Sequence, residues 1–195
     1  MALTRLGPNQ AINLASNTTG TLGVANGGTG LTSGTSGQFL KFTGSTTVAS
    51  AAAGTVKQVV SAEINSSAQT TSTSFVTTGL FKAITPSSSS NKVIVQIWSP
   101  SYYLSGGGNL HASVYRGTSG EGSGSEIIRS VQGLNSLTGN FYINGIISFI
   151  DSPASTSALT YTLMQKSADG STTGYFESGM GGTAIMQISL TEFTP

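Results

Sequence analysis

Apolar and polar residues alternate along much of the chain after residue 55. In the run from Leu110 to Tyr115, the apolar residues occupy every second position and the polar or amphipathic ones fall between them. An alternation with a period of two predicts β-strands with one buried face. Similar runs, rich in β-branched residues, predict strands at 56–64, 75–81, 92–98, 110–116, 126–131, 141–150, 159–166 and 183–193, with 174–177 as a short ninth candidate.

The last of these runs separates its residues most clearly into two sets. Met186, Ile188 and Leu190 continue the apolar set, whereas Gln187 and Ser189 point the other way. We therefore assign Met186, Ile188 and Leu190 to the core of the folded domain or to its assembly. The opposite side of this strand is expected to lie near a partner chain.

Turn-forming residues separate the predicted strands, and they define the fold class. Clusters of Pro, Gly, Ser, Asn and Asp lie at 86–91, 106–109, 117–124, 151–153 and 169–170. No window supports an amphipathic helix of any length. The prediction is an all-β protein with a C-terminal antiparallel β-sandwich of the jelly-roll kind.

The first 55 residues have a different character. They are mostly Gly, Ser, Thr, Asn and Ala, with Arg5 and Lys41 as the only charges, and the apolar residues Phe39 and Leu40 belong to no helical pattern. Such a segment buries too little apolar area to offset roughly 1 to 2 kcal/mol of backbone entropy per residue. We predict an extended anchoring arm at 1–55 and a β-sandwich head at 56–195. The arm is either a flexible tail or a segment that becomes ordered only against other chains.

Within the arm, the densest turn signal and a short strand-like run are the candidate anchoring residues. Residues 49–53 are interpreted as a small-residue spacer before the head. The candidates for anchoring and assembly are Asn26, Gly27, Gly28, Thr29 and Gly30, together with Phe39 and Leu40.

The small number of charged residues limits the kinds of partner that the protein is expected to bind. Only 8% of the residues are charged, and eight Lys or Arg against seven Asp or Glu leave a net charge of +1. This is too few basic residues for a stripe that neutralises phosphates, so we expect no nucleic-acid partner. No apolar stretch approaches a membrane span and no secretion signal is visible, so we expect no membrane insertion. Weak mutual repulsion between copies favours assembly.

The residues that carry chemistry are sparse. Cysteine is absent and His111 is the only histidine, in mid-strand on a polar face, where it is interpreted as a surface or interface residue. The acids are scattered, and Asp151 and Asp169 occupy turn contexts in which a carboxylate commonly caps backbone N–H groups. We predict no enzyme, no catalytic residue, no cofactor and no metal cluster. A single Ca²⁺ held by loop carbonyls and one carboxylate stays open.

Among the amphipathic aromatic residues, Tyr102 and Tyr103 are the pair least typical of a core. They follow Pro100 and precede the glycines at 106–108. We assign them to a candidate contact surface, against the alternative of ordinary strand packing.

Two parts of the chain resemble virion surface proteins of tailed bacteriophages, in particular marine and cyanobacterial ones. The sequence GVANGGTG at 23–30, followed by GQFL at 37–40, resembles segments of phage tail fibres. The stretches 74–80, 84–87, 92–95, 149–153, 161–163 and 188–192 are similar to a C-terminal β-sandwich module of such proteins. The resemblance implies a short homotrimeric fibre or appendage of the virion, assembled in the host cytoplasm.

The same resemblance implies the partners. The arm would attach to other virion proteins, and the head would face outward toward a host surface glycan or protein. Two alternatives stay open from the residues alone. One is a capsid decoration or cement protein, and the other is an enzyme that degrades host polysaccharide.

Overall fold

The computed structural model describes residues 29, 31, 34–45, 47–51, 56–105, 109–133, 140–170, 174–177 and 185–195. The chain divides into two compact units, residues 1–53 and 54–195. Throughout these described residues the regular structure is β-strand, which confirms the all-β class. The strands are β1 (Phe39–Phe42), β2 (Val48–Ala51), β3 (Val56–Ile64), β4 (Ala68–Thr70), β5 (Val76–Ile84), β6 (Lys92–Ser105), β7 (Asn109–Gly117), β8 (Ser125–Gly133), β9 (Asn140–Asp151), β10 (Leu159–Ser167), β11 (Gly174–Glu177) and β12 (Met186–Phe193).

The N-terminal unit contains an antiparallel hairpin of β1 and β2, in which Phe39 pairs with Ala51 and Phe42 with Val48. The interpretation of 49–53 as a mere spacer is therefore wrong for residues 49–51, which belong to β2. Small residues carry little side-chain signal, but their backbone N–H and C=O groups pair as well as any others. The side chains of β1 are all exposed, so the hairpin is held by its backbone pairing and by polar contacts such as the 2.6 Å hydrogen bond from Ser50 Oγ to Gln38 Oε1.

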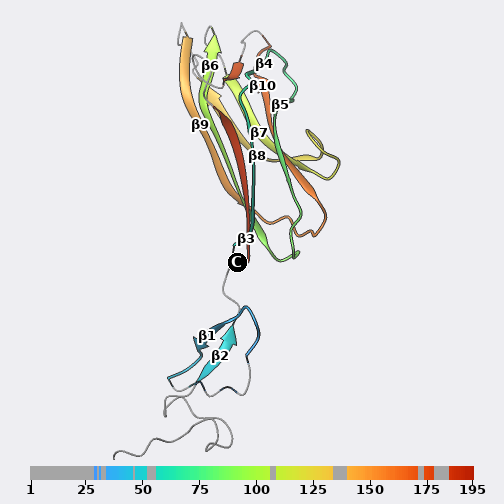
Figure 1. The fold of residues 1–195 in the computed structure, drawn as a ribbon. Helices are drawn as coiled ribbons and strands as arrows, with labels where there is room; N and C mark the ends of the chain where they lie inside the picture. Colours follow the sequence, from blue (N-terminus) through green and yellow to red (C-terminus); the bar gives the residue numbers. More distant parts are fainter. Residues whose placement is uncertain are drawn as a thin grey trace, which may run out of the picture. The chain divides into compact units, whose positions relative to one another are not determined.

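Residues 54–195 form a sandwich of two antiparallel sheets, here called the sandwich domain (Figure 1). One sheet has the order β5-β10-β7-β8. The other has the order β3-β12-β6, with β9 on the far side of β6 and the short strands β11 and β4 continuing beyond the end of β12. If the eight long strands are counted in chain order, the sheets read 2-7-4-5 and 1-8-3-6. This interleaving is the jelly-roll topology, as predicted.

Strand β6 is longer than the sequence indicated, because it continues beyond Trp98 to Ser105. Its first half pairs with β12 and its second half with β11, while β9 pairs along both halves. The β6–β9 register shifts between Ser99 and Tyr102, the segment that contains Pro100. Proline has no N–H to donate, and such irregularities are where a strand accommodates it.

The core lies between the two sheets and is built from alternate residues of the long strands. Met186, Ile188 and Leu190 have no exposed surface, and the side chains of β10 are buried along nearly all of its length. The core cluster comprises Leu80, Ile84, Val93, Val95, Ile97, Leu110, Ala112, Val114, Ile147, Leu159, Tyr161, Leu163, Met186, Ile188 and Leu190.

A carboxylate is buried at the end of this core. Glu192 Oε1 accepts hydrogen bonds from the Ser87 backbone N–H at 2.7 Å and from Asn91 Nδ2 at 2.6 Å, and Glu192 Oε2 accepts one from Gln58 Nε2 at 2.6 Å. Burial alone would raise the pKa of this carboxyl. The hydrogen bonds from Asn91, Gln58 and Ser87 outweigh burial and lower the pKa from 4.5 to about 2.

The low pKa of Glu192 predicts an acid-sensitive fold. A carboxyl with a depressed folded-state pKa contributes stability above its unfolded-state pKa, and the contribution is lost as the pH falls from about 4.5 to about 2. We expect Glu192→Gln to be less stable than wild type at pH 7 by about 2 to 4 kcal/mol, because an amide group would face the Asn91 and Ser87 donors. Between pH 5 and pH 2, its free energy of unfolding in urea should depend less on pH than that of wild type. Parallel pH profiles for the two proteins would contradict this prediction.

A second polar network connects the two sheets. Asp151 Oδ2, at the end of β9, lies 2.5 Å from Arg116 Nη1 of β7 and accepts a hydrogen bond of 2.7 Å from Tyr161 Oη of β10. Burial raises the pKa of the Tyr161 hydroxyl, and the hydrogen bond to the Asp151 carboxylate raises it further. The turn context of Asp151 predicts a capping role. Its observed partners are instead two side chains of the opposite sheet, so it holds the sandwich together.

Candidate binding groove beside Trp98

The outer face of the sheet that contains β6 carries an aromatic residue among polar ones. Gln187 of β12 pairs with Glu63 of β3 on one side and with Trp98 of β6 on the other, and Trp98 pairs with Ile146 of β9. Directly paired residues of antiparallel strands point to the same face. These four side chains therefore form one row across four strands.

The neighbouring rows differ in polarity. The next row has only hydroxyl and amide side chains, from Ser61, Ser189, Gln96 and Ser148. The row after it is largely apolar and consists of Val59, Thr191, Ile94 and Ile150. We call this last row the apolar strip. Val59 and Ile150 are each 59% exposed.

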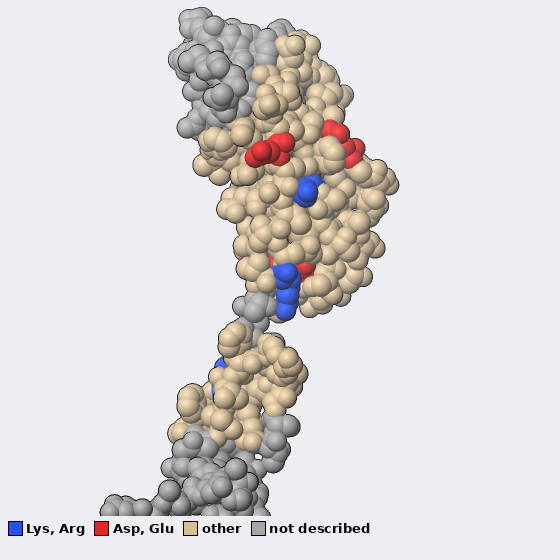
Figure 2. Space-filling model, in the orientation of Figure 1, with Lys and Arg blue, Asp and Glu red and all other residues tan. Residues whose placement is uncertain are grey.

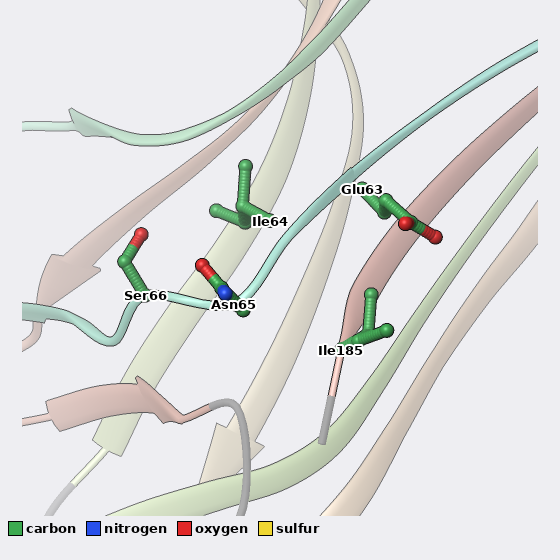
Figure 3. A pocket seen from close by; sticks show the side chains of 5 residues that line it. All are labelled: Glu63, Ile64, Asn65, Ser66 and Ile185. Atoms are coloured by element: carbon green, nitrogen blue, oxygen red, sulfur yellow. The ribbon is translucent and has the colours of Figure 1, made fainter. Parts of the chain in front are cut away.

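The row with Trp98 lies along a set of hollows. The first hollow has a volume of about 400 Å³ and the second about 160 Å³, and Trp98 and Gln187 line both of them. A third, of about 330 Å³, shares Glu63 and Ile185 with the second (Figure 3). A fourth hollow, of about 470 Å³, shares Glu63 and Ile64 with the third, but it is also lined by Phe81 and Lys82 of β5, in the opposite sheet. The first three hollows adjoin one another through their shared lining residues and make a shallow groove. We call it the Trp98 groove and define it by Glu63, Asn65, Trp98, Ile146, Ile185 and Gln187.

The side chains of the groove are available for contact. Trp98 is 45% exposed and Ile146 is 70% exposed. Glu63, Gln187 and the nearby Gln96 are exposed as well, and no hydrogen bond from another described residue holds their side chains. Figure 2 shows how sparse charged side chains are on the face of the sandwich domain that it displays. Of the groove residues defined above, Glu63 alone is charged.

The predicted anchoring residues are only partly within the described part of the chain. Asn26, Gly27, Gly28 and Gly30 lie outside the described residues. Thr29 is exposed, and its Oγ1 accepts a hydrogen bond of 3.4 Å from the Leu31 N–H. Phe39 and Leu40 are consecutive residues of β1, with 64% and 58% of their surfaces exposed.

The other predicted residues lie within the sandwich domain. Tyr102 and Tyr103 belong to β6 and pair with residues of both β9 and β11, while their side chains lie outside the described part. Assignment of this pair to a contact surface stays a prediction. Met186, Ile188 and Leu190 are core residues, on the face of β12 opposite the groove.

His111 lies half-buried on the outer face of the four-stranded sheet. Burial lowers the pKa of its imidazole most, and the positive charges of Lys166 and Arg129 lower that pKa further. Both cations also lie near the Phe75 ring, with Arg129 Cζ at 5.3 Å and Lys166 Nζ at 5.1 Å from its centroid. This cluster is well apart in the fold from the Trp98 row, because it belongs to the opposite sheet.

One signal in the sequence could have identified part of the groove. Val93, Val95 and Ile97 alternate as buried residues along β6, which places Trp98 on the outer face. A tryptophan at an outward position of a central strand is a candidate contact residue. The neighbours of Trp98 come from β3, β9 and β12, however, and only the strand register identifies them.

Other kinds of site find no support in the part of the chain that the structure covers. Its histidine and acidic residues form no group of three that could hold a metal ion. The same part contains no helix that is long and apolar enough to span a membrane.

Comparison with known proteins gives only distant likenesses. No protein-family model matches the chain, and no curated protein matches its sequence. The solved structures that resemble it include that of infectious bursal disease virus, Gx strain, with 13% identity, a TM-score of 0.34, and coverage of 79% of this chain and 40% of the other. The VP2 subviral particle of the same virus gives 12% identity, a TM-score of 0.33, and coverage of 78% and 45%. The chain thus spans less than half of the length of these proteins, and a likeness of this size carries no argument about function.

Proposed function

We propose that this protein is a non-enzymatic virion surface protein, a short homotrimeric fibre or appendage. Its N-terminal unit would attach to the particle, and its sandwich domain would be displayed toward the host surface. The observation that carries the proposal is that a single chain leaves apolar side chains exposed in both of its units.

In the N-terminal unit, the uncovered surface is the hairpin. Phe39, Leu40 and Phe42 are 64%, 58% and 70% exposed. An isolated two-stranded hairpin is at best marginally stable in water. Contact with other chains would bury these side chains and stabilise the pairing of β1 with β2, as expected for an attachment segment.

In the sandwich domain, the uncovered surface is the apolar strip. Val59 and Ile150 are exposed at its two ends, and Thr191 and Ile94 between them are half-buried. Apolar side chains left at the surface in one row are candidates for contact with other proteins. The scarcity of charge on the chain removes the repulsion that would oppose contact between copies. The strip is therefore our candidate for the contact between sandwich domains of one trimer.

The assignment to a virion rests on the sequence resemblance. The segments 23–30 and 37–40 resemble tail-fibre segments of tailed phages. The second segment contains Phe39 and Leu40, which are exposed residues of the hairpin. The resemblance and the exposed surface thus point to the same part of the chain as the attachment region.

The apolar strip provides a test of the oligomeric state. We expect wild type to sediment with three times the mass of one chain, and Ile150→Asp to sediment as a monomer, because a charge at the contact loses its hydration. Ser148→Asp is the matched control, since Ser148 lies on the same face of β9, two residues away in the polar row, and this variant should stay a trimer. Sedimentation equilibrium measures all three. A monomeric wild type, or a trimeric Ile150→Asp, would contradict the proposed contact.

Imaging of intact particles tests the location. A few to a few dozen copies at a tail or collar would support the appendage. Hundreds of copies over the shell would instead make the protein a capsid decoration.

A further inference from the structure

We propose that the Trp98 groove binds a neutral oligosaccharide, that is, a short chain of uncharged sugars on the host surface. This inference rests on the proposed function, because it supplies the ligand through which a displayed sandwich domain would attach. It is carried by the groove itself, by the exposed tryptophan and by the chemistry of the neighbouring side chains.

Trp98 provides a stacking surface for a sugar ring. One face of a pyranose carries C–H groups, which pack against the electron-rich face of an aromatic ring. Trp98 lies on β6 between β12 and β9, so its backbone is held by pairing on both sides. An aromatic ring on a rigid central strand loses little freedom on binding, which favours affinity.

The groups around Trp98 match the hydroxyls of a sugar. Gln187 is next to Trp98 in the same row, and Gln96 lies two residues before it on the same face. A carboxamide both donates and accepts hydrogen bonds, as a sugar hydroxyl does. Glu63, beyond Gln187, offers two carboxylate oxygens that can accept from two adjacent hydroxyls.

The charge of the groove selects among sugars. Glu63 is the only charged residue among those that define the groove, and it is acidic. A carboxylate at this position would repel a sialylated or sulfated sugar. Lys82 lines the adjoining hollow together with Glu63, but the two side chains form no ion pair with each other. The ligand is therefore an uncharged sugar chain.

The shape of the groove fits more than one sugar ring. Its lining residues come from β9, β6, β12 and β3, and strands about 4.8 Å apart give a span of roughly 14 Å across these four. This is the length of a short oligosaccharide. The polar row of Ser61, Ser189, Gln96 and Ser148 lies between the Trp98 row and the apolar strip, and its Gln96 and Ser189 line the hollow of about 400 Å³.

Trp98 also provides the measurement, because it is the only tryptophan of the chain. The full-length protein would be applied to an array of neutral oligosaccharides, with sialylated and sulfated ones beside them. The best neutral binder would then be titrated while the emission of Trp98 is recorded. We expect a blue shift that saturates, since stacking removes the indole from water.

Variants connect the binding to the groove. Gln187→Ala should weaken binding by about tenfold, which corresponds to about 1.4 kcal/mol. Trp98→Ala has no tryptophan emission, so its binding is measured by calorimetry. This variant should stay folded and show no detectable binding. Phe75→Ala is the matched control, because the Phe75 ring packs beside Tyr115 of the opposite sheet and lines neither the groove nor the hollow that adjoins it. It should bind like wild type.

The outcomes separate this inference from the proposed function. A wild-type trimer that binds no neutral oligosaccharide, or that prefers the acidic ones, would overturn the inference and leave the trimeric appendage standing. Equal binding by Trp98→Ala and wild type would also overturn it. Saturable binding that is lost in Trp98→Ala would support the groove even if the protein sediments as a monomer, in which case the trimer would be wrong. Shortening of the bound sugar chain would show hydrolysis and contradict a purely binding role.

Discussion

Ile188→Asp should prevent the sandwich domain from folding. Ile188 has no exposed surface and lies in the core on β12, with β3 and β6 paired on either side. A carboxylate at this position would lose its hydration without gaining a partner, and the cavity left by the smaller side chain would add to the loss. The expected destabilisation exceeds about 4 kcal/mol, a large part of the stability of a domain of this size.

The neighbouring position provides the control. Gln187 is exposed on the opposite face of the same strand, so Gln187→Asp places the same charge one residue away in water. We expect this variant to fold and to lose no more than about 1 kcal/mol, from repulsion between the new carboxylate and Glu63 at the paired position of β3. Circular dichroism and urea denaturation of both variants measure the effect. A cooperative unfolding transition of normal midpoint for Ile188→Asp would show that the apolar face of β12 is assigned wrongly.

Gly124→Ala should have the second largest effect. Gly124 has a φ of +87°, and a Cβ at this position would lie 1.9 Å from the Arg116 carbonyl oxygen. The methyl group would thus meet backbone, which has no rotamer to change, and the residue would carry the strain of the left-handed region as well. The turn from β7 to β8 would have to open. Its opening would also break the hydrogen bond of 2.9 Å from the Gly122 N–H to Thr162 Oγ1 of β10.

A second glycine of the same turn separates these two causes. Gly120 has a φ of +98°, and a Cβ added there would have nothing within 4 Å, so Gly120→Ala introduces strain without a clash. We expect a loss of about 1 to 2 kcal/mol for Gly120→Ala and of more than about 3 kcal/mol for Gly124→Ala. Urea denaturation at pH 7 gives both values. Similar losses in the two variants would mean that the backbone relaxes away from the Arg116 carbonyl.

The strands were the most predictable part of the fold. β3 and β11 have the bounds that the alternation indicated, and most of the other predicted strands differ from the observed ones by a few residues at their ends. The sequence pattern failed to predict two short strands. Val48–Ala51 has too little side-chain signal, and Ala68–Thr70 is only three residues long. In both places the backbone pairing that makes the strand is set by a neighbouring strand.

Polar side chains within the sandwich were less predictable than apolar ones. Glu192 and Asp151 look like surface residues in the sequence, yet the first is fully buried and the second bridges the two sheets. Their partners are distant along the chain. Gln58 of β3 reaches Glu192 and Arg116 of β7 reaches Asp151. No local pattern contains that information, because each partner belongs to a different strand.

By itself, the sequence determined the period-two patterning of most strands, and hence an all-β chain. It also determined a core-poor N-terminal segment and a nearly uncharged surface. Side-chain polarity is a local property, so these features could be deduced residue by residue. The tertiary structure alone decided the order of the strands in the two sheets. That order brings Glu63, Gln187, Trp98 and Ile146 into one row, because backbone hydrogen bonds between distant segments fix their register.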